Sequence, residues 1–262
     1  MYTVIMAAHN EERYIGTALR SVFSQTLKPD KVIVVLDRCS DKSEDVAKGF
    51  PVEIIKKEEK KWVFSYAENL ELARRLVKTP FLAIVDADVE LEPDYFERLL
   101  LEMDDKTCCA GGGVVTRCKT FLCRLLRYWE KTYRFSTDRR PRGCALLVRT
   151  SFLEEIGGFA DVPAPDTYIQ DMGRVRGYSI KIVEGAKAYH IRDITIGRAL
   201  RTQFNTGIGR YVMGKSFLRT LGHSIVRLRP FVLIGYLYAT SKREYQTLRR
   251  KIVNHMKVYT GV

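Results

Sequence analysis

The chain has 262 residues, 46% of them hydrophobic, which is enough for one large domain with a substantial core and an appendage. Its net charge is +13, and its six cysteines are too few and too irregularly spaced for a disulfide-rich secreted scaffold. Strand-like residues begin at Tyr2 with no apolar region behind a basic start, which argues against a cleaved leader.

The strands and helices of an α/β protein can be followed along the sequence. Strands are predicted at residues 2–8, 32–36, 52–55, 81–85, 112–116, 144–148 and 180–183. The first strands are short and apolar, and segments with apolar residues at helical spacing follow them. This alternation predicts a mainly parallel central sheet with helices on both faces. A basic amphipathic helix is expected over Phe121–Tyr133.

The positive charge is concentrated in the last quarter of the chain. Residues 196–262 hold thirteen of the 44 Lys and Arg residues and only one of the 31 acids, so their net charge is +12 and that of residues 1–195 is +1. The uncharged run Phe231–Ala239 is too short to span a membrane, which takes about 20 residues. Its basic and aromatic flanks favour a helical segment in the headgroup region of a membrane. A basic helix packed on the body is the alternative.

Polar residues follow three of the predicted parallel strands. They are His9-Asn10 after the first strand, Asp37 after the second and Asp86-Ala87-Asp88 after the fourth. Ligands bind beyond the carboxyl ends of such strands, so these side chains are expected to share one crevice. Two carboxylates at i and i+2 suit Mg²⁺ or Mn²⁺, which stabilises the charge that develops on a departing diphosphate. Ordinary turn chemistry is the alternative for the Asp-Ala-Asp sequence.

The order of these motifs resembles the family 2 glycosyltransferases over residues 2 to about 192. The matching segments are Val4–Glu11, Ser21–Thr26, Val34–Ser43, Ile84–Asp88 with Pro93-Asp94, Arg142–Arg149, Ile156–Phe159, Gln170-Asp171 and Gly177-Tyr178. Two departures are Leu36, where the family has an acid, and Glu68, where it has Arg. The resemblance implies the GT-A fold and inverting transfer of a sugar from a UDP- or GDP-sugar.

The resemblance also implies roles for individual residues. Ala7, Ala8, His9 and Glu11 would line the nucleotide pocket, Asp37 would bind the base, and Asp86 would hold the ribose and the cation. Asp88 would be the more direct ligand of Mn²⁺ or Mg²⁺. His190 would complete the metal site or contact the diphosphate, with a structural role as the alternative. Asp171 would be the general base, with a helix cap as the alternative. Direct displacement needs such a carboxylate to take the proton of the acceptor hydroxyl.

These roles divide the chain into a catalytic domain and a tail. Residues 1–110 are expected to bind the nucleotide sugar, residues 111–195 to face the acceptor, and residues 196–262 to associate with a membrane. The acceptor is expected to be a glycan or a lipid-linked hydroxyl, reached from an anionic membrane surface. We expect a peripheral, cytoplasmic location on the inner face of the cell membrane, and no nucleic-acid partner.

The sequence is also compatible with several alternatives. The basic tail also suits a nucleic-acid-binding protein, and a similar sheet occurs in sugar-1-phosphate nucleotidyltransferases. The cysteines are interpreted as structural or incidental, with a Cys118–Cys123 disulfide as the alternative. Trp62, Trp129 and Tyr133 either stack on sugar or lipid or pack in the core or an interface.

Overall fold

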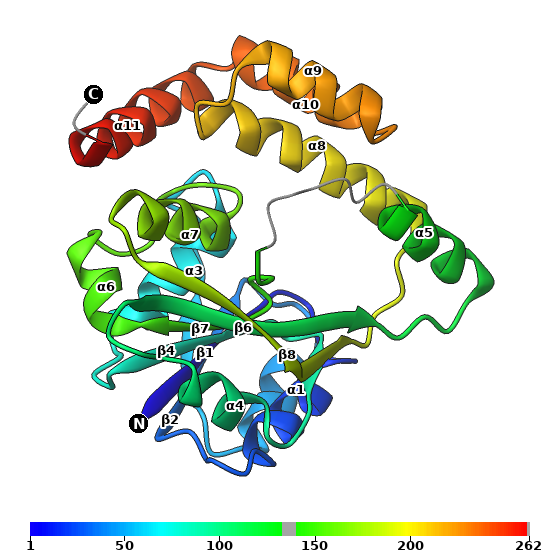
Figure 1. The fold of residues 1–262 in the computed structure, drawn as a ribbon. Coiled ribbons are helices and arrows are strands. Elements are labelled where there is room, and N and C mark those ends of the chain that lie inside the picture. The colour runs from blue at the N-terminus through cyan, green and yellow to red at the C-terminus, as the bar shows by residue number, and fades with distance from the viewer. Residues whose placement is uncertain (133–139, 261–262) are drawn as a thin grey trace.

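One mixed sheet is the central layer of the molecule (Figure 1). The computed structural model describes residues 1–132 and 140–260, without the side chains of residues 129–132 and 258–260. The strands of this part of the chain are β1 (Tyr2–Ala8), β2 (Lys31–Asp37), β3 (Glu53–Lys57), β4 (Phe81–Val85), β5 (Val89–Leu91), β6 (Thr107–Thr116), β7 (Ala145–Arg149) and β8 (Ser179–His190). They form one sheet in the order β3-β2-β1-β4-β7-β6-β8-β5.

Helices cover both faces of this sheet. The helices of the body are α1 (Ile15–Phe23), α2 (Ser43–Lys48), α3 (Ser65–Arg74), α4 (Tyr95–Leu101), α5 (Phe121–Thr132), α6 (Thr150–Glu155) and α7 (Pro165–Val175). The C-terminal extension consists of α8 (Ile196–Val212), α9 (Phe217–Val226), α10 (Pro230–Ser241) and α11 (Arg243–Thr260). Figure 1 shows these four helices as a further layer beyond α7. The predicted α/β class is confirmed.

The parallel half of the sheet forms as the apolar runs predict. β1 pairs in parallel with β2 and β4, and β2 pairs in parallel with β3. Because side chains alternate along a strand, Val4 and Met6 pack with α1 on one face, whereas Ile5 packs with α3 on the other. The carboxyl ends of β1, β2 and β4 therefore meet at one edge, where the polar residues were expected.

The second half of the sheet departs from the expected pattern. β7 is antiparallel to both β4 and β6, and the three-residue strand β5 matches none of the strands predicted from the sequence. β8 continues to His190 instead of ending near residue 183, because its outer part pairs with β5 and β6. Much of β8 is only half-buried and carries lysines, so it lacks the apolar signal of a buried strand.

Two glycines let the extension fold back on itself. A methyl group on Gly207 of α8 would lie 2.0 Å from the carbonyl oxygen of Val232, and one on Gly235 of α10 would lie 2.0 Å from that of Phe204. Only a residue without a Cβ allows the two backbones to approach so closely. The apolar run at residues 231–239 therefore has one side buried against α8. Among the described residues, no helix is both long and apolar enough to span a membrane.

The extension also shares the core of the body. Leu248 and Ile252 of α11 belong to the same apolar cluster as Tyr168 and Ile169 of α7. The extension thus packs on the body, as the alternative interpretation of the tail held, while other apolar side chains of the extension remain exposed.

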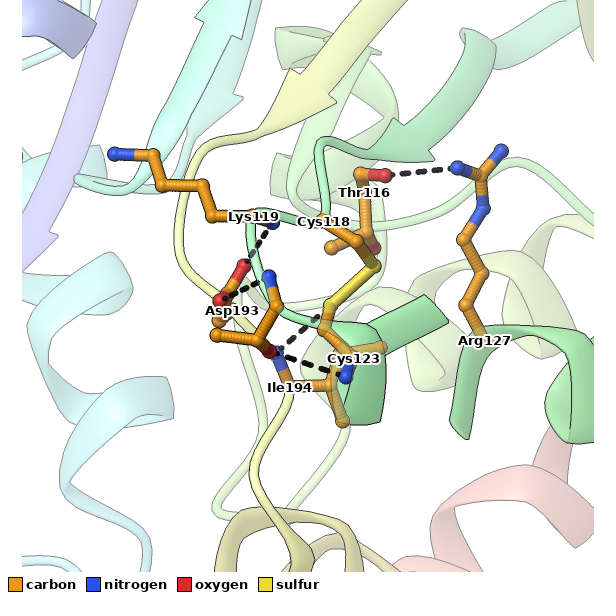
Figure 2. The surroundings of a disulfide bond; sticks show 8 residues. Thr116, Cys118, Lys119, Cys123, Arg127, Asp193 and Ile194 are labelled. Carbon is orange, nitrogen blue, oxygen red and sulfur yellow. Dashed lines mark hydrogen bonds between the residues drawn. A yellow bond between two sulfur atoms is a disulfide. The ribbon is translucent and has the colours of Figure 1, made fainter. Parts of the chain in front are cut away.

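The start of α5 is tied to the segment that precedes α8 (Figure 2). Cys118 and Cys123 form a disulfide, so the alternative interpretation of these two cysteines is correct. The carboxylate of Asp193 accepts hydrogen bonds from the backbone N–H groups of Lys119 (2.8 Å) and Thr120 (3.1 Å). α5 is therefore clamped at its first turn. The Trp129 side chain and Tyr133 lie outside the described part of the chain, and Trp62 is half-buried.

Candidate active site

A crevice of about 230 Å³ opens at the carboxyl edge of the parallel strands. Its lining comes from β1 and its following loop, the ends of β2 and β4, α3 and the start of α8. The lining residues are Ala7, Ala8, His9, Glu11, Asp37, Tyr66, Asn69, Asp86, Ala87, Asp88 and Arg198. All the residues predicted to bind the nucleotide, and both carboxylates predicted to bind the cation, thus lie together.

The loops after β1 and β2 hold each other in place. The Nδ1 atom of His9 lies 2.6 Å from the backbone oxygen of Asp37, the geometry of a hydrogen bond that a protonated Nδ1 donates. The backbone N–H of Ser40 donates to Oδ1 of Asn10 at 2.8 Å. Asn10 has a φ of 56°, a conformation that asparagine tolerates better than most residues. Hydrogen bonds between these two loops therefore hold one wall of the crevice together.

Asp37 is a buried carboxylate that three side chains hold by hydrogen bonds. It accepts hydrogen bonds from Arg38 (2.8 Å), Ser65 (2.6 Å) and Asn69 (3.1 Å). Burial favours the neutral acid, but these hydrogen bonds, with the charge of nearby Lys57, outweigh it and hold the pKa of Asp37 well below its usual range. Asp37 is thus a permanent anion that can accept a further hydrogen bond from a ligand.

Glu68 occupies the position where the family has Arg, and the structure gives it a local partner. Its carboxylate lies 2.9 Å from Nζ of Lys57 and accepts a hydrogen bond from the backbone N–H of Lys61 at 3.0 Å. Both side chains of the pair are almost fully buried. The negative charge that Glu68 introduces at this position is therefore neutralised by Lys57.

Asp86 and Asp88 have different surroundings, although one residue separates them. Asp86 accepts a hydrogen bond from the hydroxyl of Tyr66 at 2.7 Å. Burial, reinforced by the charge of Asp88, raises the pKa of Asp86 to about 6. Asp88 is 5% exposed, and its pKa is lowered because hydrogen bonds and charges from His190 and Arg198 outweigh the effect of burial.

Two arginines that the sequence analysis did not single out contact the predicted cation ligand. Nε of Arg192 lies 3.0 Å from Oδ2 of Asp88, and Nη2 of Arg198 lies 3.2 Å from the same oxygen. Arg192 also contacts the carboxylate of Glu11. Burial and the neighbouring Arg198 lower the pKa of Arg192 to about 10. Two arginine side chains therefore contact the carboxylates of the crevice, Arg192 at Glu11 and Asp88, and Arg198 at Asp88.

His190 reaches the site through strand pairing. Val89 of β5 pairs with His190 of β8, which brings Nδ1 of His190 to 3.4 Å from Oδ1 of Asp88. Asp86, Asp88 and His190 thus offer oxygen and nitrogen donors of the kind that Mn²⁺ accepts. Among the described residues, however, no group of three His, Cys, Asp or Glu side chains is gathered closely enough to hold an ion alone. The donor set fits a cation whose remaining ligands are phosphate oxygens and water.

Asp171, the predicted general base, does not line this crevice. It is a buried residue of α7 whose Oδ1 lies 2.6 Å from Nη1 of Arg140. Asp166, in the first turn of the same helix, packs against Gly143 and interacts electrostatically with Asp86. Burial raises the pKa of Asp166. The structure therefore brings a second carboxylate of α7, which was not predicted from the sequence, close enough to Asp86 to act on its charge.

A sheet of this topology with an acidic crevice at the strand ends is typical of α/β proteins that bind their ligands beyond the carboxyl ends of the strands. A model of the glycosyl transferase family 2 matches residues 3–152, which is more than half of the chain. The chain therefore belongs to glycosyl transferase family 2, and the resemblance noted in the sequence is confirmed.

Individual relatives are consistent with this assignment. EpsH of Bacillus subtilis (strain 168), a protein named as a glycosyltransferase, is 31% identical over 111 residues, which are 40% of this chain and 31% of EpsH. The match thus spans about a third of the length of that relative.

Solved structures share the fold at low sequence identity. A mannosyltransferase from Pyrobaculum calidifontis, solved with GDP-mannose and Mn²⁺, has a TM-score of 0.62 at 16% identity and covers 99% of this chain and 85% of its own. Glucosyl-3-phosphoglycerate synthase from Mycobacterium tuberculosis, solved with Mn²⁺, UDP and phosphoglyceric acid, has a TM-score of 0.58 at 14% identity and covers 79% and 76%. The predicted GT-A fold is confirmed by these likenesses.

Proposed function

We propose that the chain transfers a sugar from a nucleotide diphosphate-sugar to an acceptor hydroxyl, with inversion at the anomeric carbon. The observation that carries this proposal is the gathering of Asp37, Asp86 and Asp88 in one crevice at the strand ends. The solved relatives with GDP-mannose or UDP bound support a nucleotide-sugar donor. Asp37 would bind the base, Asp86 the ribose, and the backbone of Ala7, Ala8 and His9 would line the nucleotide.

Asp88, Asp86 and His190 would hold a divalent cation, Mn²⁺ or Mg²⁺, as the two neighbours that contain Mn²⁺ suggest. When bound, such a cation neutralises charge on the departing diphosphate. Arg192 and Arg198 would bind diphosphate oxygens from the side of the extension, because guanidinium groups form strong charge-assisted hydrogen bonds to phosphate. Glu11 would orient Arg192 through their direct contact.

The general base is proposed to be a carboxylate of α7. Asp171 is the residue that the sequence favoured, and it lines a cavity beside the crevice. Asp166 is the competing candidate, since it interacts electrostatically with Asp86 and its raised pKa suits a proton acceptor. Asp166→Asn and Asp171→Asn separate the two: the base variant should lose about 100-fold or more in kcat. The other variant should keep kcat within a few-fold, and donor affinity should be unchanged in both.

The acceptor is proposed to be lipid-linked or close to an anionic membrane surface. Phe121, Leu125 and Tyr128 of α5 are more than half exposed, as are Leu218 and Ile225 of α9. Exposed apolar side chains on helices with an excess of Lys and Arg suit the headgroup region of a membrane. A peripheral location on the cytoplasmic face of the cell membrane belongs to the same proposal.

A panel of nucleotide sugars tests the proposed reaction. The full chain is incubated with UDP- and GDP-sugars, with and without Mn²⁺ or Mg²⁺, and free nucleoside diphosphate is measured. We expect release with one base class, dependent on the cation, and a loss of about 100-fold or more in Asp88→Ala. Full turnover in Asp88→Ala would refute the proposed cation ligand.

A further inference from the structure

The extension and α7 enclose a second cavity, separate from the donor crevice. Its volume is about 450 Å³, within the range of small-molecule sites. The residues that line it come from α7 and the loop before it, and from α8 and the turn after it. They are Pro163, Ala164, Thr167, Asp171, Thr202, Asn205, Thr206, Gly209, Arg210, Met213 and Lys215. None of these residues lines the donor crevice.

Positive charge exceeds negative charge around this cavity. Asp171 is the acid of its lining, and it is paired at 2.6 Å with Arg140. Lys215 also faces Asp171, but its Nζ lies 3.8 Å from Oδ2. Arg210 is the second cation of the lining, so the described charged residues that line the cavity, Asp171, Arg210 and Lys215, have a net charge of +1. Charges that are partly removed from water without a counterion are costly, so the site favours an anionic ligand.

Arg210 is held in position by neutral groups. Its Nε donates to the hydroxyl of Thr220 at 3.1 Å, and its Nη2 donates to the backbone oxygen of Arg219 at 2.9 Å. In the part of the chain that the structure describes, no carboxylate pairs with it. The guanidinium is thus fixed at the cavity wall with its charge uncompensated.

One carboxylate oxygen of Asp171 lacks a hydrogen bond within this basic surrounding. Its Oδ2 is buried and accepts no hydrogen bond from the described residues. When the Asp171 carboxylate turns toward the cavity that it lines, an alcohol there can donate a hydrogen bond to this oxygen, while an anionic group of the same molecule meets Arg210 and Lys215. Thr202, Asn205 and Thr206 add neutral hydrogen-bonding groups along α8.

The first turn of α7 takes part in the surroundings of both sites. Asp166 of this turn interacts electrostatically with Asp86 and packs on Gly143, whereas Ala164 and Thr167 line the cavity. Neighbouring residues of one turn thus act on Asp86 and border the cavity.

We propose that this cavity is the acceptor site and that it binds a phosphorylated alcohol, with the phosphate at Arg210 and Lys215 and the hydroxyl at Asp171. The inference rests on the proposed glycosyl transfer and names the acceptor class for it. The phosphate belongs either to a lipid headgroup or to a soluble phosphate ester, and α8 supplies one wall of the site in both cases.

Calorimetric titration of the full chain tests the site. The donor crevice is first saturated with Mn²⁺ and UDP or GDP, and the probes are then sn-glycerol 3-phosphate, dihexanoylphosphatidylglycerol below its micellar concentration, and glycerol. We expect a phosphorylated probe to bind and glycerol not to bind. Binding of only the lipid assigns the site to a headgroup, and binding of only glycerol 3-phosphate assigns it to a soluble ester.

Two variants and a matched control make the test specific. Lys215→Met removes a half-exposed cation, and Asn205→Trp fills the cavity from the accessible side of α8, so both should fold. Each substitution should lower the affinity for the phosphorylated probe about 10-fold or more, because a charged hydrogen bond or the space for the ligand is lost. Arg201→Met removes an exposed charge of α8 outside the lining, and it should change the affinity for the phosphorylated probe less than twofold.

Two results would overturn the proposal: no binding of either phosphorylated probe to the nucleotide-saturated chain, or equal losses in Lys215→Met and Arg201→Met. The nucleotide titration itself reports on the donor crevice. A failure of the proposed function, with no nucleotide bound, is therefore distinguishable from a failure of the acceptor site.

Discussion

Two arginines contact one carboxylate oxygen of Asp88, Oδ2, whereas its other oxygen, Oδ1, faces His190. Arg192 and Arg198 both contact Oδ2, and their charges repel an incoming Mn²⁺. A nucleotide diphosphate provides these arginines with other anionic partners. At the scale of single residues, cation and nucleotide are therefore expected to bind together rather than separately.

The Arg198→Ala variant tests this coupling through two affinities that should change in opposite directions. Without nucleotide, the affinity for Mn²⁺ should rise several-fold because a repelling charge is removed. The affinity for the nucleotide diphosphate should fall about 10-fold because a charged hydrogen bond is lost. Mn²⁺ binding is measured by electron paramagnetic resonance and nucleotide binding by calorimetry, with Arg201→Ala as the control. If both affinities fell together, Arg198 would have only a structural role.

His223 makes stability depend on pH. It is half-buried on α9, and burial, with the charges of Arg210, Arg227 and Arg229, lowers its pKa to about 4. The unfolded side chain titrates near pH 6.5, so between these values the unfolded chain binds more protons than the folded chain. Folding stability is therefore not reduced by His223 above about pH 6.5, and it falls as the pH is lowered from 6.5 toward 4.

Urea unfolding at pH 7.5 and pH 5.0 measures this effect. The chain should lose on the order of 1–2 kcal/mol of unfolding free energy through His223 between these conditions. His223→Gln keeps a polar side chain that does not titrate, so its loss over the same interval should be smaller by that amount. Equal losses in both proteins would show that His223 does not titrate in this way.

Among the elements, α5 is the most exposed part of the proposed membrane surface. Phe121 is 79% exposed and Leu125 is 54% exposed, while the clamp by Asp193 and the disulfide holds the start of the helix. Transfer of these side chains from water to an apolar environment is favourable by about 1.5–3 kcal/mol each if they are fully buried. α5 is therefore expected to anchor the chain to vesicles.

Co-sedimentation with anionic vesicles at moderate salt tests this role of α5. Phe121→Ser with Leu125→Ser should reduce binding by about 10-fold or more, given the transfer energies of the two side chains. Leu101→Ser removes a leucine of α4 that is 82% exposed, more than Leu125, and should leave binding unchanged. No sedimentation of the unaltered chain would refute the membrane proposal, and salt-sensitive binding to RNA instead would favour the nucleic-acid alternative.

On the scale of the whole molecule, the body and the extension share one apolar cluster. Ile252 of α11 is 6% exposed and belongs to the cluster that contains Tyr168 and Val148 of the body. Phe64 of the body stacks on Tyr245 of α11, with ring centroids 5.9 Å apart. The extension should therefore unfold together with the body, although its composition differs.

Thermal and urea unfolding of Ile252→Ala tests this expectation. The variant should lose about 2–4 kcal/mol in a single transition, the usual cost of truncating a buried isoleucine. Ile225→Ala, at a side chain that is 63% exposed on α9, should cost less than about 0.5 kcal/mol. Two separate transitions, with only the first affected, would mean that residues 196–262 form an independent unit.

The sequence alone determined the parallel half of the sheet and the acids at its edge. β1, β2 and β4 are encoded by local apolar runs, and Asp37, Asp86 and Asp88 follow these strands directly, so their convergence follows from strand polarity. β5 and the outer part of β8 were not predictable in this way, because they depend on pairing between distant and partly polar segments.

The tertiary structure decided which groups complete the site. Arg198 lies 110 positions from Asp88 in the chain, and no local pattern marks it as a partner of that acid. Asp166, Tyr66 and the cavity of Lys215 and Arg210 likewise depend on how α3, α7 and α8 pack. Strand ends are a local property of the sequence, whereas the partners of long polar side chains follow from packing between elements that are far apart along the chain.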